Sequence, residues 1–522
     1  MSDNFKSSSF SFEPLTPLSF LERSAEVYAD QIAVIDGDLR ITYRELRRRS
    51  RRLAFQFKAK GVSPGDRVAV LTPNNHVLLE SHYSVPYAGA VLVALNFRLA
   101  ISELIGIISH AECNFLLYDP IFGKAAAQIA QSLSPNLQLM AADQKYEDSL
   151  NAGPELSVPV LDECELLALN YTSGTTGSPK GVMYHHRGAY LQSLAMTKHF
   201  DLTSSSVYLW TLPMFHCNGW CFTWAVTAAG GTHVCLPNFD ADEAWLSIRH
   251  DSVTHLCAAP TVLTMLASSS QARTNDGQSI RVAVGGAPPS PWIIATCENL
   301  GLSVTHLYGL TETFGPAAIC DWKAEWNSLP STERSIRAAR QGVGNLISQT
   351  LRVIDSEGAD VPRDGSTVGE IVIRGNNVML GYYKDPAATL AAVIDGWFHT
   401  GDLAVMHPDS YVEIRDRLKD VIISGGENIS SIEVESALIS HPSVLEAAVV
   451  ATADDHWGER PIAFVYLVDG EQEDEDGLRN HVRTLLASFK VPDRIIFGPL
   501  PKTSTGKIQK FLLREIVKSQ LN

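Results

Sequence analysis

The chain has 522 residues, and this length predicts about three or four domain-sized units rather than a single core. Its formal net charge of −16 argues against a nucleic-acid-binding protein, which needs a basic face. A composition of 45% hydrophobic and 19% charged residues is ordinary for a soluble globular protein. No apolar run is long enough to span a membrane, the N-terminus lacks a secretory signal, and the terminal SQLN differs from the peroxisomal address SKL. A cytoplasmic location is therefore expected.

Apolar runs alternate with helical patterns through most of the chain. The expected strands are residues 66–74, 91–96, 114–119 and 166–174, and the expected helices are residues 76–90, 102–111 and 188–200. This alternation predicts parallel sheets whose faces are covered by helices.

The stretch YTSGTTGSPKG, residues 171–181, has the composition of a phosphate-binding loop. Its glycines let backbone N–H groups turn toward an anion, and Lys180 adds a positive charge. Gly181 follows Lys180, whereas Ser or Thr follows the lysine of the common phosphate loop. A flexible linker is the alternative. It is disfavoured because a buried strand is expected before the loop and a helix after it.

The eight cysteines are scattered and show no disulfide framework. In LPMFHCNGWCFTW, residues 212–224, Cys217 and Cys221 lie near His216, which raises a metal site as one interpretation. No second ligand pair follows at a spacing typical of zinc sites. Reduced and mostly buried thiols in a cytosolic protein are therefore expected.

The stretch HLYGLTET, residues 306–313, reads as the end of an apolar strand followed by polar side chains. Strand ends that face a crevice carry the chemistry of many α/β proteins. Tyr308 could stack on a purine, Thr311 could touch a phosphate, and Glu312 could hold Mg²⁺. An ordinary surface turn would explain this stretch equally well in isolation.

In GWFHTGDLA, residues 396–404, Asp402 is predicted to lie in a turn after an apolar run. A carboxylate there could accept hydrogen bonds from both ribose hydroxyls, although an ordinary Asp turn is an alternative. The sequence changes character at residues 415–430, where charge gives way to an apolar run and then to Gly and Ser.

Beyond this change, the sequence predicts a helix at 432–440, strands at 444–451 and 461–468, a helix at 474–488 with an acidic start, and a basic tail. These elements suffice for a separate α+β domain of about 100 residues. We predict domains at residues 1–417 and 418–522. The tail contains PKTSTGKIQK, residues 501–510, where Lys507 follows a Thr-Gly turn. Alone, it would pass for a basic surface segment.

Together, five of these stretches resemble the adenylate-forming superfamily of acyl-CoA synthetases, adenylation domains and luciferases: residues 171–181, 306–313, 396–404, 415–430 and 501–510. The resemblance runs from about residue 12 to the C-terminus. It implies an α/β fold with a large N-terminal domain, built from two sheet subdomains with helices and a distorted β-barrel. It also implies a small mobile α+β C-terminal domain that reorients between two half-reactions. ATP, Mg²⁺ and CoA are the implied cofactors and co-substrates, and a homodimer is compatible with the family.

The resemblance also implies roles for individual residues. The ATP- or AMP-binding residues would be Thr172, Ser173, Gly174, Thr175, Thr176, Gly177, Lys180, Gly286, Ala287, Pro288, Tyr308, Gly309, Thr311, Asp402 and Arg417. The catalytic residues would be Lys507, Thr311, Glu312 and His216, with Glu312 also holding the metal. The acyl pocket would contain His216, Trp220, Gly285 and Gly309. Lys419 would be the hinge, and Gly425, Gly426 and Glu427 would face the thiol acceptor.

The acid substrate is predicted from residues 212–224. Amino-acid-activating relatives anchor the α-ammonium with an Asp in this region, and this stretch contains no acid. A plain carboxylic acid with an apolar tail therefore fits better, with His216 beside its carboxylate; a packed core histidine is the alternative. Trp220 and Trp224 either shorten the pocket or belong to the core. Residues 320–342 resemble those of short- and medium-chain acyl-activating enzymes, including methylmercaptopropionate-CoA ligases.

The predicted function is therefore that of an AMP-forming acyl-CoA synthetase for small or medium carboxylic acids, with a role in fatty-acid metabolism. Three alternatives remain open. The first is a stand-alone enzyme that adenylates an acid and loads it onto a carrier protein. The second is a luciferase-like oxygenase, and the third is a non-catalytic nucleotide-binding protein.

Overall fold

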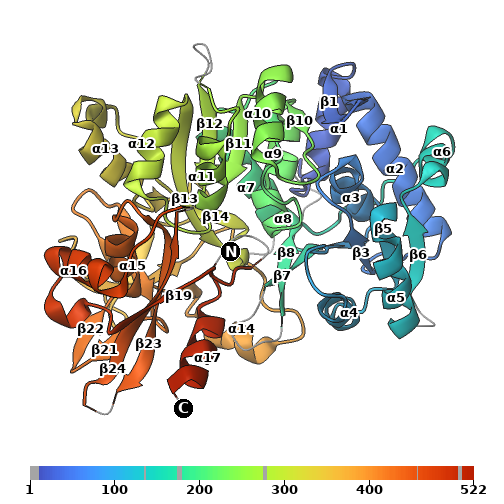
Figure 1. The fold of residues 1–522 in the computed structure, drawn as a ribbon. Coiled ribbons are helices and arrows are strands. Elements are labelled where there is room, and N and C mark those ends of the chain that lie inside the picture. The colour runs from blue at the N-terminus through green and yellow to red at the C-terminus, as the bar shows by residue number, and fades with distance from the viewer. Residues whose placement is uncertain are drawn as a thin grey trace, which may run out of the picture.

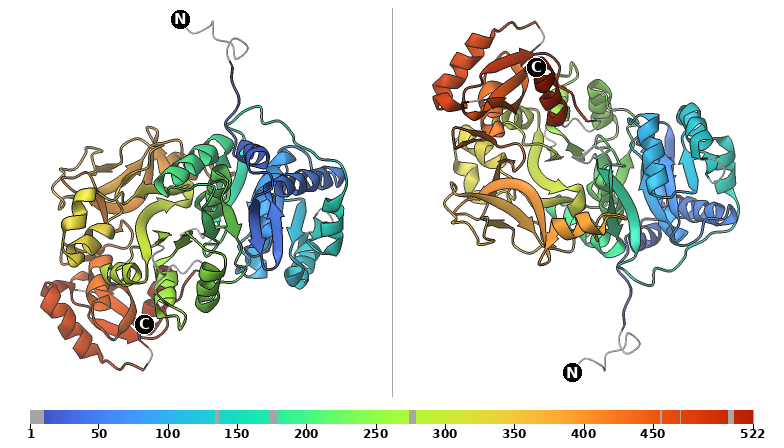
Figure 2. Two further views of the ribbon diagram at one scale, coloured as in Figure 1. Left: turned by 90° about the horizontal axis from the view of Figure 1, so that it is seen from above. Right: turned by 90° about the horizontal axis from the view of Figure 1, so that it is seen from below.

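The computed structural model describes residues 11–133, 137–172, 179–273, 279–454, 456–468, 470–503 and 508–521. Within these residues, the strands form four sheets. Figure 1 shows that two α/β lobes lie side by side, and Figure 2 shows the small C-terminal domain beside the antiparallel sheet, away from the N-terminal lobe. None of the described helices is long and apolar enough to cross a membrane.

The six-stranded sheet has the strand order β6-β5-β3-β4-β7-β8. Its strands are β3 (Arg67–Leu71), β4 (Val91–Ala94), β5 (Phe115–Tyr118), β6 (Gln138–Ala141), β7 (Leu166–Thr172) and β8 (Lys180–His185). The first five run parallel, and β8 is antiparallel to β7. Helices α3 (His76–Tyr87), α4 (Ile101–His110), α5 (Gly123–Leu133) and α6 (Gln144–Asn151) belong to the same lobe. Both faces of this sheet are covered, so β3 is an almost continuous apolar run.

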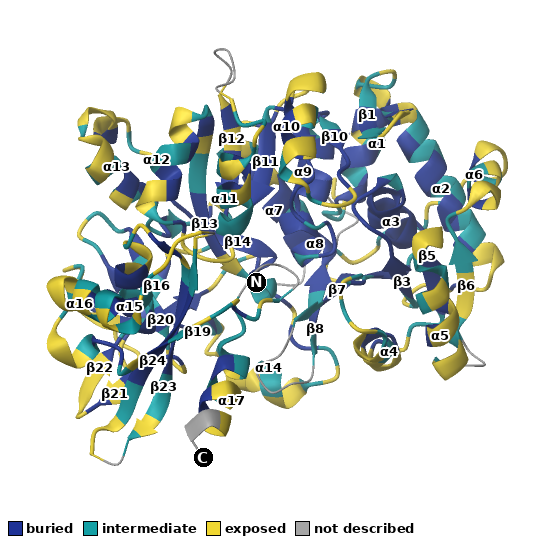
Figure 3. Ribbon diagram, in the orientation of Figure 1, coloured by how far each residue is buried: buried dark blue, intermediate teal, exposed yellow. Residues whose placement is uncertain are grey.

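The nine-stranded sheet has the strand order β15-β14-β13-β12-β11-β9-β10-β1-β2. Its strands are β1 (Ile32–Asp36), β2 (Leu39–Thr42), β9 (Val207–Leu209), β10 (Thr232–Val234), β11 (His255–Ala258), β12 (Ile280–Val284), β13 (Leu302–Leu310), β14 (Gly315–Ile319) and β15 (Val343–Gly344). The helices of this part are α1 (Leu18–Val27), α7 (His186–His199), α8 (Cys217–Trp220), α9 (Phe222–Ala229), α10 (Ala241–His250), α11 (Pro260–Ser268), α12 (Pro291–Asn299) and α13 (Ser331–Ala338). Helix α2 (Tyr43–Ala59) packs against α3 and α6 of the six-stranded lobe. The inner helices and strands are the most buried part of the molecule (Figure 3).

A five-stranded antiparallel sheet follows, where the resemblance implies a distorted barrel. It contains β16 (Arg352–Ile354), β17 (Val368–Ile373), β18 (Val393–Ile394), β19 (Trp397–Met406) and β20 (Val412–Arg417), with α14 (Pro386–Ala392) before β18. The C-terminal domain has a sheet of β21 (Ile422–Ser424), β22 (Glu427–Ile429), β23 (Val444–Asp454), β24 (Gly458–Leu467) and β25 (Arg494–Phe497). Its helices are α15 (Ser431–Ile439), α16 (Glu475–Leu485) and α17 (Lys510–Leu521).

The predicted mixed α/β fold, with a large N-terminal and a small C-terminal domain, is confirmed. The acidic run before α16 is a helix start, as predicted: Asp474 accepts a hydrogen bond from the Gly477 N–H, and two more acids lie in the first turn. The domain boundary between residues 417 and 418 stays a prediction.

Three local predictions were wrong. The loop of residues 171–181 is followed by strand β8 and only then by the predicted helix, α7, so it joins two strands of a hairpin. Asp402 lies within β19 rather than in a turn, because β19 continues past it and pairs with β20. The basic tail ends in a helix, α17, whose residues Leu513 and Val517 are buried four positions apart on one face.

Four buried histidines predict that the protein loses stability in mild acid. Burial lowers the pKa of His82, His186 and His306 to about 4 and that of His233 to about 3. These groups are neutral when folded and take up a proton on unfolding below pH 6.5. The four histidines therefore leave the free energy of unfolding unchanged above that pH. They lower it progressively as the pH drops from 6.5 toward 4. At pH 5 each of these histidines should lower the free energy of unfolding by about 2 kcal/mol.

The measurement is the thermal unfolding midpoint at pH 7 and at pH 5. His306→Gln should reduce the difference between the two midpoints, because it removes one of the four groups. His250→Gln is the matched control, since the His250 side chain is 77% exposed. Equal midpoints at both pH values for the unaltered protein would contradict the prediction.

Candidate active site

The β7–β8 hairpin places the two described ends of the predicted phosphate loop near the turn that follows β13. Thr172 pairs with Lys180 at the mouth of the hairpin. The Lys180 ammonium lies 4.7 Å from the centre of the Tyr382 ring, a cation–π contact. The predicted ligands Ser173, Gly174, Thr175, Thr176 and Gly177 lie outside the described residues. The strands therefore position both described ends of the loop.

Tyr382 connects the hairpin to Glu312, which follows β13. The Tyr382 hydroxyl donates a 2.8 Å hydrogen bond to Glu312 Oε1. Burial, and then the charge of Glu312, raises the pKa of Tyr382, so this phenol stays a neutral donor. Lys180, Tyr382 and Glu312 thus form a chain of contacts across the site.

The surroundings of Glu312 fit the magnesium ion that the family implies. Among the described residues, no group of three His, Cys, Asp or Glu side chains could hold a metal ion. Glu312 offers a carboxylate, one oxygen of which accepts from Tyr382, and a metal held there would need further oxygen ligands. This is how Mg²⁺ binds in many nucleotide sites, where substrate phosphates and water complete its shell.

Thr311 is held from two sides. Its carbonyl accepts a 2.6 Å hydrogen bond from the Tyr184 hydroxyl, and its Oγ1 lies 3.4 Å from Cys217 Sγ. The Tyr184 ring stacks on Phe314, with centroids 3.9 Å apart. The turn after β13 is therefore fixed by packing as well as by hydrogen bonds, as a phosphate contact requires.

Asp402 bonds to a tyrosine and to an arginine that come from two other strands. The Tyr308 hydroxyl donates to Asp402 Oδ2 at 2.7 Å, and Arg417 Nε lies 2.9 Å from Asp402 Oδ1. Asp402 and Arg417 are directly opposite each other in β19 and β20. Burial, and then the charge of Asp402, raises the pKa of Tyr308 well above its usual value. An ionised carboxylate with two partners still has lone pairs for the hydroxyls of a ribose.

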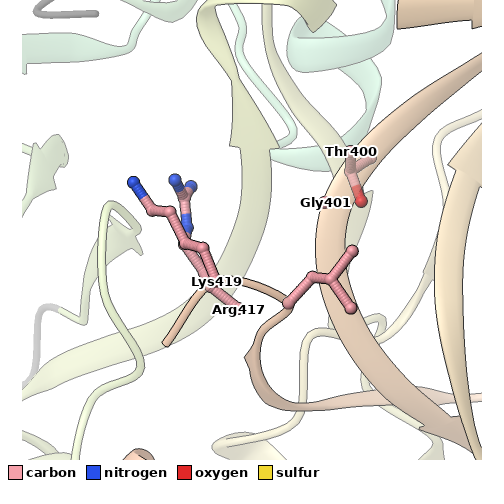
Figure 4. Close-up of a pocket in the computed structure, with 5 residues that line it drawn as sticks. Thr400, Gly401, Arg417 and Lys419 are labelled. Carbon is pink, nitrogen blue, oxygen red and sulfur yellow. The ribbon is translucent and has the colours of Figure 1, made fainter. Parts of the chain in front are cut away.

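A hollow of about 320 Å³ lies beside this carboxylate. It is lined by Thr400, Gly401, Arg417, Leu418 and Lys419. Figure 4 shows that the Arg417 and Lys419 side chains extend in the same direction on one side of the hollow, with Thr400 on the other. Burial lowers the pKa of the Lys419 ammonium. The predicted ribose contact and the predicted hinge lysine therefore share one hollow.

The Trp220 ring lies between the end of β12 and the start of β14. A Cβ on Gly285 would lie 2.9 Å from the Trp220 ring, and a Cβ on Gly315 would lie 3.1 Å from the Trp220 Cδ1. Trp220 is 6% exposed. Trp224, in contrast, is fully buried, and its ring meets the His82 ring edge-on. Both tryptophans belong to one buried core cluster, and only Trp220 also lies against Gly285, the predicted pocket glycine, and against Gly315.

The remaining predicted residues of this region lie before α8, after β12 and within β13. His216 precedes α8, and its Nε2 lies 3.9 Å from Cys217 Sγ. Gly286, Ala287 and Pro288 are exposed at the end of β12. Gly309 is required by close packing, because a Cβ there would lie 1.8 Å from the Gly315 carbonyl oxygen.

The cysteines give no support to a metal site. All eight are free thiols. Burial raises the pKa of Cys217 to about 12, so it stays protonated, and burial also raises the pKa of Cys221. Six of the eight are buried, as predicted.

In the C-terminal domain, Gly425 and Gly426 form the tight turn of the β21–β22 hairpin, and Glu427 begins β22. Gly425 has φ +60°, and a Cβ there would lie 2.7 Å from the Trp457 ring. The turn therefore needs glycine for both conformation and space. Lys507 lies outside the described residues.

Comparisons with known proteins agree with this arrangement. Residues 21–383 match the family described as AMP-binding enzyme, and residues 433–507 match the AMP-binding enzyme C-terminal domain. The chain belongs to the AMP-binding enzyme family. The resemblance identified from the sequence motifs is thereby confirmed.

This AMP-binding enzyme has curated relatives that match along nearly their whole length. It is 43% identical to a 2-methylpropanoate–CoA ligase of Humulus lupulus, over 97% of this chain and 96% of the relative. It is 43% identical to a peroxisomal acetate/butyrate–CoA ligase of Arabidopsis thaliana (96% and 94%). It is also 41% identical to 4-hydroxybutyrate–CoA ligase 2 of Metallosphaera sedula (98% and 96%).

Solved structures of similar proteins include two with bound nucleotides. ATP-bound MatB from Rhodopseudomonas palustris superimposes with a TM-score of 0.86 at 28% identity, over 97% of this chain and 100% of that one. The o-succinylbenzoate CoA synthetase of Bacillus subtilis, in complex with its acyl-adenylate, gives 0.84 at 27% identity (98% and 99%). The AMP-binding enzyme therefore shares its fold, including the small domain, with both.

The sequence motifs did not predict two contacts of this AMP-binding enzyme. Tyr382 lies 70 residues from Glu312, in a stretch without motif character. The pairing of Asn170 with Asn218 was missed as well. The one signal was composition: each asparagine interrupts an apolar run, and a buried amide needs a partner.

Proposed function

We propose that this AMP-binding enzyme converts short- to medium-chain carboxylic acids without an amino group into their CoA thioesters. The enzyme class is that of the relatives, which are named CoA ligases along nearly the whole chain. It is an acid–thiol ligase that uses ATP, Mg²⁺ and CoA. The observation that carries the substrate range is Trp220, whose ring fills the space beside Gly285 and Gly315.

In the first half-reaction, a carboxylate oxygen of the acid bonds to the α-phosphorus of ATP. The bond from that phosphorus to the β-phosphate oxygen breaks, and pyrophosphate leaves. We propose that Asp402 and Arg417 hold the ribose, that Thr311 contacts the α-phosphate, and that Lys180 contacts the outgoing phosphates. Glu312 would hold Mg²⁺, which supplies neutralising charge to the phosphates when bound. Lys507 would add a second positive charge as pyrophosphate leaves.

In the second half-reaction, the sulfur of CoA bonds to the acyl carbon and AMP leaves with the electron pair of the acyl–oxygen bond. We propose that the small domain turns about Lys419 and brings the Gly425–Gly426 turn to the acyl-adenylate. One cleft then serves both steps while bulk water stays out.

The acid range agrees with the names of the relatives. These include ligases of acetate, butyrate, 2-methylpropanoate and 4-hydroxybutyrate, and also a trans-cinnamate:CoA ligase at 40% identity. The absence of an acidic residue in 212–224 supports an acid without an ammonium group. Loading of a carrier protein is not favoured, because the relatives are named as ligases of CoA. We also propose a role in fatty-acid metabolism, a homodimer and a cytoplasmic location, although three of the relatives are named peroxisomal.

The test is pyrophosphate release with a panel of acids from acetate to dodecanoate and with cinnamate, in the presence and absence of CoA. The expected result is CoA-dependent AMP formation that is fastest with acids of a few carbons. If no acid yields pyrophosphate, the proposed activity is wrong. If acyl-adenylate forms but CoA never accepts the acyl group, the carrier-loading alternative is correct.

A further inference from the structure

The short segment α8 is a left-handed turn that joins His216 to helix α9. Five consecutive residues, from Cys217 to Cys221, have φ between 46° and 64°. Gly219 takes up this conformation freely and Asn218 tolerates it, but the Cβ of Cys217, Trp220 and Cys221 disfavours it. Backbone strain of this kind persists only where the surroundings enforce it, and it is concentrated at functional sites. The contacts that hold the turn therefore indicate what it is for.

Two buried asparagines hold the turn by exchanging hydrogen bonds. Asn170 Nδ2 donates to Asn218 Oδ1 at 2.6 Å, and the Asn218 N–H donates to Asn170 Oδ1 at 3.2 Å. The two residues are 2% and 1% exposed. Among the residues the structure describes, Asn218 Nδ2 has no partner, and an unpaired buried donor lowers stability. The pair is thus costly as a purely structural element.

The turn lies between the two halves of the active site. Asn170 belongs to β7 and precedes Thr172, at the mouth of the phosphate hairpin, by two residues. On the turn itself, Cys217 contacts Thr311, and Trp220 packs against Gly285. A displacement of β7 would therefore reach the wall of the acid pocket through the asparagine pair.

We propose that Asn170 and Asn218 are positioning residues that couple the acid pocket to the phosphate hairpin. Their amide pair locks the left-handed turn, which sets the position of Trp220 and of the Cys217–Thr311 contact. ATP bound at the hairpin fixes β7, and the pair passes this constraint to the pocket. Coupling of this kind is reciprocal, so each substrate increases the affinity for the other. The inference rests on the proposed function, because both sites serve acid activation.

The test measures binding of butyrate by calorimetry, with and without a non-hydrolysable ATP analogue. We expect the analogue to tighten butyrate binding about tenfold in the unaltered protein, within the usual range of coupling between sites. Asn170→Ala deletes the amide on β7 that makes both hydrogen bonds of the pair. Asn218→Gly removes the pair from the turn side while keeping a residue that readily adopts positive φ. Both variants should lose most of the tenfold effect, and KM for butyrate should rise while kcat at saturation is retained.

The double variant should be no worse than either single variant, because both remove the same interaction. Asn345→Ala is the matched control: it deletes another buried amide, bonded to Gln192 and Pro316, and should leave the coupling intact. Unchanged coupling in the single variants, additive losses in the double variant, or absent coupling in the unaltered protein would each overturn the inference. The acid panel tests the proposed function separately, since an enzyme without this coupling still releases pyrophosphate.

Discussion

Lys507→Ala is expected to slow acyl-adenylate formation by about 10²–10³-fold, the usual cost of removing one transition-state charge contact. The same variant should retain thioester formation when it is supplied with acyl-adenylate and CoA. The reason is that pyrophosphate departure builds negative charge in the first half-reaction only. The measurement compares pyrophosphate release with thioester formation from synthetic butyryl-adenylate, both in single-turnover experiments.

Lys502→Ala is the matched control for this prediction. Lys502 lies in the same tail, and its ammonium pairs with Glu446 of the small domain. Its loss should leave both half-reactions unchanged, because that ion pair lies within the small domain. Equal losses in the two half-reactions of Lys507→Ala would contradict a small domain that alternates between two positions.

The links between the small domain and β20 bear on this motion. Asp416 accepts hydrogen bonds from the backbone and the hydroxyl of Ser431 at the start of α15. Lys510, at the start of α17, donates to the same Ser431 hydroxyl and pairs with Glu435 at 2.7 Å. Rotation about Lys419 would separate Asp416 from the other three residues. These polar contacts can break and reform in water more readily than an apolar interface of the same size.

Much of the site could be predicted from the sequence because its residues lie at strand ends. Hydrophobic periodicity marks the end of β13, and the polar residues that follow must then lie at the edge of the sheet. Thr311 and Glu312 were placed in this way, whereas Tyr308 lies within β13 itself. The same reasoning failed for Asp402, because Thr-Gly-Asp reads locally as a turn. Its pairing with Arg417 in β20 decides that β19 continues, and pairing between strands is not encoded in a short stretch.

The contacts between distant segments could not be predicted. Tyr382 and Glu312 meet because the segment after β17 bonds to β8, through the bridge between Val182 and Tyr382, and also donates from the Met379 N–H to the Glu312 carbonyl. The left-handed turn was hidden for another reason. Only Asn218 and Gly219 favour positive φ, whereas Cys217, Trp220 and Cys221 adopt it under constraint from their neighbours. Local propensity gives no signal for a conformation that tertiary packing imposes.

Trp220→Gly is expected to shift the preferred acid from a few carbons to longer chains. Each methylene admitted to an apolar pocket is worth about 1–3 kcal/mol, or roughly 10–200-fold in kcat/KM. Removing the indole beside Gly285 should therefore raise kcat/KM for octanoate relative to propanoate by at least about 10²-fold. The variant is expected to fold, because Trp220 has φ +53° and glycine relieves that backbone strain. The measurement is the chain-length profile of CoA-dependent AMP formation.

Two further substitutions separate pocket volume from general loosening of the core. Trp224→Phe alters a fully buried ring in the same segment and should lower stability without changing the profile. Gly285→Ala acts in the opposite direction: its new Cβ would lie 2.9 Å from the Trp220 ring and press it further into the pocket. This variant should therefore shift the preferred acid in the chain-length profile toward acetate. If Trp220→Gly kept the original profile while Trp224→Phe broadened it, the indole of Trp220 would be a packing element, and another side chain would have to set the depth of the acid pocket.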